Sequence, residues 1–133
     1  FRAYQEQVKK NAVLLAAELM GRGYKVLTGG TDCHMLLIDL RPQNITGKEA
    51  ALALEEAGIV VNKNSVPFDT QSPFITSGIR IGTPSVTARG MKEKEIKTIA
   101  DFIDTVLKNA GDADVKKKVK SGVKKLCGEF KIY

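Results

Sequence analysis

An apolar stripe in the last third of the chain is the feature that most restricts what the chain can fold into. The stripe consists of apolar residues at helical spacing: Ile96, Ile99, Ala100, Ile103, Val106 and Leu107. Steps of three and four residues place these side chains on one face of a helix, and that face must pack against an apolar surface. At 133 residues, the chain is long enough for one domain whose core supplies this surface.

The segments before this helix predict a mixed α/β domain. An apolar stripe that ends at Leu19 predicts a first helix, which Gly21 and Gly23 terminate. Thr46 and Glu49 have the spacing of a capping box and predict the start of a second helix, which ends before Gly58. Short apolar runs predict strands within residues 24–30, 34–40, 59–64 and 77–82. The resulting order of elements is typical of a small two-layer sheet with helices on one side.

The net charge of +6 raises the question of nucleic-acid binding. The excess of lysine is concentrated in residues 115–125, where Val115, Val119 and Val123 form the apolar face of a last helix. The lysines fall mostly on the opposite face, and no aromatic side chain is interleaved with them, as binding to single strands generally requires. We therefore predict a solvated helix face and no nucleic-acid partner.

Cysteine and histidine usage argues against a metal site and a disulfide framework. Cys33 and Cys127 lie far apart in the sequence, and His34 is the only histidine. This pattern predicts no zinc site and favours a reducing compartment. No apolar run approaches membrane-spanning length, and the start does not resemble a signal peptide. We expect a cytoplasmic protein with no membrane partner.

Common catalytic motifs are missing from the sequence. There is no Walker-type phosphate loop and no GxGxxG pattern. His34 precedes a predicted buried strand without an identifiable nucleophile beside it, so a structural role is favoured over a catalytic one. Asp39 lies inside an apolar run that we expect to be buried on both faces, and we expect it to pair with a buried donor. These residues by themselves do not predict a stand-alone enzyme.

The run "SGIRIG" places an arginine between two glycines. In a strand, Ile79 and Ile81 point to one face, whereas Gly78, Arg80 and Gly82 share the other. Glycines leave hollows beside the guanidinium, whose planar fork matches a carboxylate. The first interpretation is therefore a small-anion site at Arg80. The alternative is an arginine on the wet face of an edge strand, with glycines that mark a bulge or bend.

The segment "NKNSVPFDTQSPF", residues 62–74, precedes this strand and combines asparagines, serines and prolines. Prolines stiffen the backbone, so the segment can present amides beside Arg80 as one edge of a ligand site. An ordinary connecting loop explains the same composition, and the residues alone leave both interpretations open.

These segments together resemble one family. The runs "YQEQVKKNA", "LTGGTDCHMLLIDLR", "TGKEA", "NKNSVPFD" and "SPFITSGIRIGTPSVTARG" are similar, in order and spacing, to the C-terminal domain of bacterial serine hydroxymethyltransferases. The similarity extends from Tyr4 to the last helix and is densest from Thr28 to Gly90. The resemblance implies that residues 1–133 form the small C-terminal domain of an aspartate aminotransferase-like (fold type I) pyridoxal phosphate enzyme.

The resemblance also implies an activity. The family uses pyridoxal phosphate to transfer a one-carbon unit between serine and tetrahydrofolate, which yields glycine, and its members form homodimers or tetramers. The arginine that matches Arg80 binds the substrate carboxylate. The family's folate contacts match Asn64, Ser72, Pro73 and Phe74.

The sequence departs from the family in two respects. Cys33 stands where the family commonly has asparagine, and the large domain with the cofactor lysine has no counterpart in these residues. We therefore expect a fragment that holds no catalytic or cofactor-binding residue, binds no cofactor and has no turnover alone. The competing hypothesis is a free-standing amino-acid-binding or regulatory module.

Overall fold

The computed structural model describes residues 2–27, 35–82 and 92–129. In chain order the elements are α1 (Arg2–Gly21), β1 (Lys25–Val26), β2 (Met35–Asp39), the 3-10 helix η1 (Arg41–Gln43), α2 (Gly47–Glu56), β3 (Asn62–Asn64), β4 (Gly78–Gly82), α4 (Glu93–Lys108) and α5 (Ala113–Glu129). Within the described residues, the predicted order of helices and strands is confirmed. Cys33 and His34 lie outside the described residues, so the predictions made for them stay predictions.

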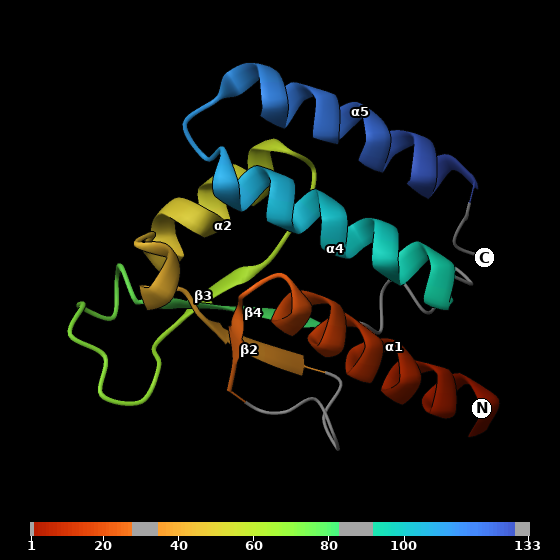
Figure 1. The fold of residues 1–133 in the computed structure, drawn as a ribbon, viewed down its shortest axis with the longest axis horizontal. Helices are drawn as coiled ribbons and strands as arrows, with labels where there is room; N and C mark the ends of the chain where they lie inside the picture. The colour runs from red at the N-terminus through yellow and green to blue at the C-terminus, as the bar shows by residue number, and fades with distance from the viewer. Residues whose placement is uncertain (1, 28–34, 83–91, 130–133) are drawn as a thin grey trace.

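The four strands form one antiparallel sheet in the order β1-β2-β4-β3. Strand β4 therefore lies in the interior of the sheet, where Arg80 faces Leu37 of β2 on one side and Asn62 of β3 on the other. The ribbon shows the helices gathered on one side of this sheet (Figure 1). The predicted mixed α/β architecture is thus confirmed at this level.

The helices are stacked in more than the single layer that the sequence predicts. Helix α1 packs against β1 and β2, and α2 packs against β3 and β4. Helix α4 packs against both α1 and α2, and α5 lies further out, against α4 and α2 (Figure 1). The apolar stripe of α4 explains this arrangement, because Ile96, Ile103 and Val106 are all fully buried.

The core lies between the helices and one face of the sheet. Strand β2 contributes Leu36 and Ile38, and β4 contributes Ile79, all of them fully buried. Leu37 points to the opposite face and is partly exposed. The prediction that β2 is buried on both faces is therefore wrong at Leu37, because in the described residues the helices cover only one face of this sheet.

The predicted N-cap at the start of α2 is confirmed, but the Glu49 side chain reaches the Thr46 hydroxyl and not the Thr46 backbone amide that a full capping box requires. The Thr46 Oγ1 accepts a hydrogen bond from the Glu49 backbone amide at 3.1 Å, and its hydroxyl donates to the Glu49 carboxylate at 3.0 Å. This side chain satisfies one of the free amides at the helix start and so fixes where α2 begins.

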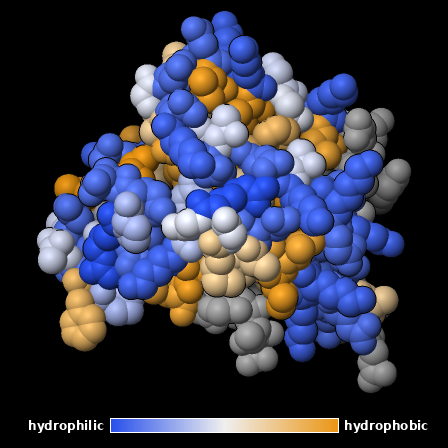
Figure 2. All heavy atoms as spheres, viewed as in Figure 1, coloured by the Kyte–Doolittle hydropathy of each residue, from blue (hydrophilic) through white to orange (hydrophobic). Residues whose placement is uncertain are grey.

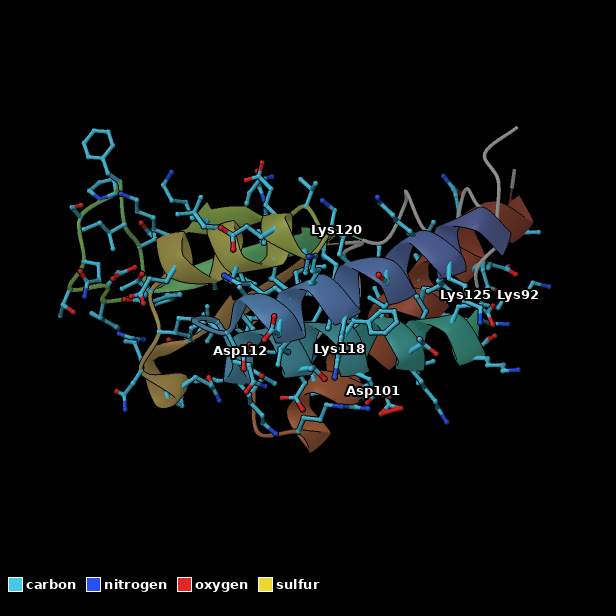
Figure 3. All side chains as sticks on the ribbon, turned by 90° about the horizontal axis from the view of Figure 1, so that it is seen from above. Lys92, Asp101, Asp112, Lys118, Lys120 and Lys125 are labelled. Carbon is cyan, nitrogen blue, oxygen red and sulfur yellow. The ribbon has the colours of Figure 1, made fainter. Side chains whose placement is uncertain are left out.

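Helix α5 has the two-faced character that its sequence predicts. Val119 is buried, whereas Lys118, Lys120 and Lys125 are exposed. These lysines are distributed along α5 in the view from above (Figure 3). The half-buried Lys116 instead pairs with Glu56 of α2, which ties α5 to the layer beneath it.

Candidate functional site

Arg80 lies on the sheet face that points away from the helices. Its neighbours Ile79 and Ile81 are buried in the core, so alternation along β4 directs Arg80 to the opposite face, where it is exposed. Across residues 2–27, 35–82 and 92–129, no hydrogen bond or ion pair engages the Arg80 guanidinium. A guanidinium on an interior strand that has no partner among the described residues is able to bind a carboxylate in a bidentate manner.

The structure corrects two expectations about the surroundings of Arg80. The edge-strand alternative is wrong, because β4 has partners on both sides and pairs with β2 in continuous register without a bulge. The expected hollow at Gly78 is also wrong. A Cβ at this position would lie only 2.6 Å from Val66 Cγ1, so Val66 fills the space beside Arg80 on that side.

Asn64 shares the sheet face of Arg80. It pairs with Gly78 on β4, while Asn62 pairs with Arg80, and directly opposed residues project to the same face. The Asn64 side chain is half-buried and donates from Nδ2 to the Ser65 carbonyl oxygen at 2.9 Å. This bond uses the amide nitrogen of Asn64, and its amide oxygen Oδ1 remains chemically able to accept a hydrogen bond.

Residues 65–77, which we call the β3–β4 loop, extend beyond the sheet on the side opposite the N- and C-termini (Figure 1). Ser72, Pro73 and Phe74 are exposed here, and Phe74 retains 81% of its accessible surface. Phe68 retains 94%. An apolar side chain protrudes from the lower left of the molecule, in the region of this loop (Figure 2). Such exposure of two aromatic rings on one loop is typical of a contact surface.

Asp69 holds the β3–β4 loop together from within. Its Oδ2 accepts hydrogen bonds from the backbone amides of Val66 at 3.2 Å and Ser77 at 2.8 Å. Its Oδ1 accepts from the Gln71 amide at 2.8 Å and the Ser77 hydroxyl at 2.7 Å. Desolvation acts to raise the pKa of Asp69, but these four bonds outweigh it and lower the pKa to about 2.

Arg41 anchors the first part of the loop to the sheet. Its Nη1 donates to the Phe68 carbonyl at 3.2 Å, and its Nη2 donates to the Pro67 carbonyl at 3.3 Å. Phe68 has a positive φ of 58°, a conformation that a phenylalanine adopts only when its surroundings hold it there. The contacts from Arg41 are part of those surroundings.

The same arginine neutralises a buried carboxylate. Arg41 Nε donates to both oxygens of Asp39 at 3.0 Å, and the Arg41 backbone amide adds a bond of 3.0 Å to Oδ1. Burial acts to raise the pKa of Asp39, and the bonds from Arg41 reverse the effect and lower it. The prediction that Asp39 pairs with a donor is confirmed, although that donor is partly exposed.

The end of the loop is fixed by the first turn of α2. The free backbone amides of Gly47 and Lys48 donate to the carbonyls of Thr76 at 3.0 Å and Ile75 at 2.9 Å. A Cβ at Gly47 would lie 2.1 Å from Thr76 Oγ1, so the absent side chain permits this approach. The helix start and the loop end therefore satisfy each other's backbone groups.

Arg41 and Asp69 are functional candidates that the sequence does not identify. In the sequence, Arg41 is only the residue that ends a strand, and Asp69 is one member of a polar loop. One local pattern does point to Asp69, because an aspartate in a turn commonly accepts from the amide two residues later, here Gln71. Its bonds to Ser77 depend on the folded loop.

The described residues offer no candidate for a metal site or a membrane span. Their histidine, cysteine, aspartate and glutamate side chains form no cluster of three or more suited to a metal ion. None of the described helices is long and apolar enough to cross a membrane.

The described residues thus form a mixed α/β fold that presents an arginine on the open face of its sheet and an anchored loop beyond the sheet (Figure 1). The model of the family described as serine hydroxymethyltransferase matches residues 1–103. A serine hydroxymethyltransferase from Halorhodospira halophila (strain DSM 244 / SL1) is 53% identical over 133 residues. The chain belongs to the serine hydroxymethyltransferase family, as its motifs predict. It is covered completely by this alignment, but it spans only 32% of the relative's length.

Proposed function

We propose that this chain acts as the C-terminal small domain of a serine hydroxymethyltransferase of fold type I. The intact enzyme would transfer a one-carbon unit between serine and tetrahydrofolate in the cytoplasm, as a homodimer or tetramer. The observation that carries the proposal is the exposed Arg80 on an interior strand, with no internal partner among the described residues. Family membership supplies the reaction to which this arginine is assigned.

In this proposal, Arg80 binds the carboxylate of serine or glycine through two parallel hydrogen bonds. Strand β4 is hydrogen-bonded to a strand on each side, so the backbone that carries the Arg80 side chain is held in place. The guanidinium can therefore set the orientation of the bound amino acid. Fixing a substrate in its reactive orientation can lower the activation free energy of the reaction by several kcal/mol, and by about 7 kcal/mol or more in the best cases. Asn64, Ser72, Pro73 and Phe74 are assigned to tetrahydrofolate.

Pyridoxal phosphate does not fit the residues described in this chain. A cofactor of this kind needs a lysine in an enclosed site, whereas every described lysine is exposed except Lys116. Lys116 is half-buried, but it pairs with Glu56. We therefore assign the cofactor and its lysine to another part of the intact enzyme, and this chain to substrate positioning.

The test is folate-dependent conversion of serine to glycine by a full-length serine hydroxymethyltransferase that carries this sequence. Arg80→Lys keeps the charge but loses the planar fork, so kcat/KM for serine should fall by roughly a hundredfold or more. Arg22→Lys is the matched control, because Arg22 pairs with Glu18 and Asp101 away from the sheet face of Arg80. Equal activity of the Arg80→Lys and Arg22→Lys variants would show that Arg80 has a structural role.

A further inference from the structure

We propose that Asp69 is a positioning residue that holds the folate-facing turn in its binding conformation before the ligand arrives. The inference rests on the proposed function, because it assigns the turn formed by residues 72–74 to tetrahydrofolate. It adds a residue that makes no proposed contact with folate itself. Asp69 acts through the loop backbone, which its carboxylate ties together at three points.

The first step of the argument is the position of the three tied points along the loop. Val66 lies at its start, Gln71 directly before the turn, and Ser77 at its end, and all three donate backbone amides to one carboxylate. The turn is therefore the arch between Gln71 and Ser77. Within that arch, the amides of Ile75 and Thr76 both donate to the Ser72 carbonyl, at 3.0 and 2.9 Å.

The second step concerns the folate-facing residues themselves, because the bonds from α2 reach the arch at Ile75 and Thr76 rather than at residues 72–74. Ser72, Pro73 and Phe74 are exposed, so core packing does not fix their positions. A loop without such packing loses conformational freedom when it binds a ligand, and this loss weakens binding. Internal hydrogen bonds to a carboxylate remove that cost in advance, because a charged acceptor forms the stronger class of hydrogen bond.

The third step connects the loop to the substrate arginine. Ser77 donates both its amide and its hydroxyl to Asp69, and β4 begins at the next residue. Arg80 itself is fixed by strand pairing on both sides of β4. Loss of Asp69 should therefore loosen the folate-facing turn far more than it displaces Arg80.

The experiment uses the full-length enzyme that carries this sequence, with the variants Asp69→Ala and Asp69→Asn. We expect Asp69→Ala to raise KM for tetrahydrofolate about tenfold, which corresponds to about 1.4 kcal/mol. Asp69→Asn should give a smaller rise, because one carbonyl oxygen still accepts from the loop amides. The KM for serine should change by less than about twofold, since strand pairing holds Arg80.

Asp104→Asn serves as the matched control. Asp104 accepts a hydrogen bond from the Tyr24 hydroxyl at 2.7 Å and pairs with Lys108, so the substitution neutralises a partnered carboxylate in the helical layers, away from the loop. It should leave both KM values near those of the wild type. An equal rise in both KM values for Asp69→Ala would indicate general loosening and would overturn the positioning role.

Amide hydrogen exchange in the same enzymes separates this inference from the proposed function. Peptides that cover residues 65–77 should exchange faster in Asp69→Ala than in the wild type or in Asp104→Asn. Unchanged exchange, or an unchanged folate KM in an active enzyme, would overturn the role of Asp69 alone. A wild-type enzyme that does not convert serine to glycine would overturn the proposed function and the folate assignment with it.

Discussion

The Asp39 carboxylate and the Arg41 guanidinium form a close ion pair in which Oδ2 and Nη2 are 2.6 Å apart. The aspartate side chain is 1% exposed and the arginine side chain 39% exposed, so the arginine brings its charge to a carboxylate that water does not reach. The same guanidinium donates to the carbonyls of Pro67 and Phe68. One arginine therefore both neutralises a buried charge on β2 and holds the start of the β3–β4 loop.

We expect Arg41→Ala to destabilise the 133-residue chain clearly, because it removes the guanidinium from the buried Asp39 carboxylate. The backbone amide of residue 41 and the more distant Lys25, at 3.9 Å, then remain as its partners. Arg22→Ala is the control, since its partner Asp101 is 64% exposed and such surface pairs contribute little. Urea unfolding followed by circular dichroism measures both free energies of unfolding. A loss no larger for Arg41→Ala than for Arg22→Ala would contradict the importance of this pair.

Gly78 should tolerate no larger side chain. A Cβ there would lie 2.6 Å from Val66 Cγ1 and 2.7 Å from the Ile38 carbonyl oxygen, so Gly78→Ala should reduce the free energy of unfolding by about 2 kcal/mol or more. Gly21→Ala is the matched control, because a Cβ at Gly21 would meet no atom within 4 Å and α1 ends there. Thermal unfolding of both variants measures the effect as the midpoint temperature of unfolding. Equal midpoint temperatures for Gly78→Ala and Gly21→Ala would refute the packing argument.

The stability of the chain should fall in acid through Asp69. Its pKa is lowered in the folded state from the ordinary value of 3.8 to about 2, so its contribution is fully present above about pH 4. That contribution is lost as the pH falls from about 4 to about 2, because the unfolded chain binds a proton first. Unfolding free energies of the wild type and Asp69→Asn should therefore converge over this interval. A constant difference between them down to about pH 2 would argue against the low pKa.

The 133-residue chain alone should show no turnover and should retain no pyridoxal phosphate. After incubation with the cofactor and dialysis, we expect no visible absorbance, because every described lysine other than the paired Lys116 is exposed. Calorimetry should detect at most very weak binding of serine or glycine. Arg80 can bind the carboxylate of the amino acid, but we identify no group among the described residues that would bind its amino group. Tight binding would instead support the free-standing amino-acid-binding module.

Much of the fold is predictable because its signals are local. The stripe of α4 and the N-cap of Thr46 each operate within a few turns of chain, where sequence spacing translates directly into spatial contact. The extra outer tier formed by α5 is not predictable in this way. Its position depends on the contacts of Val119 and Lys116 with elements far away in the sequence.

The sequence by itself determined the helices, the strands, the family and the choice of Arg80 as a site candidate, because periodicity, caps and motifs are properties of neighbouring residues. Only the tertiary structure decided that β4 lies inside the sheet and that Val66 fills the space at Gly78. It also decided that Asp69 closes the loop on Ser77. Strand order and packing are contacts between distant segments, and such contacts follow from how the whole chain buries its apolar faces rather than from any local pattern.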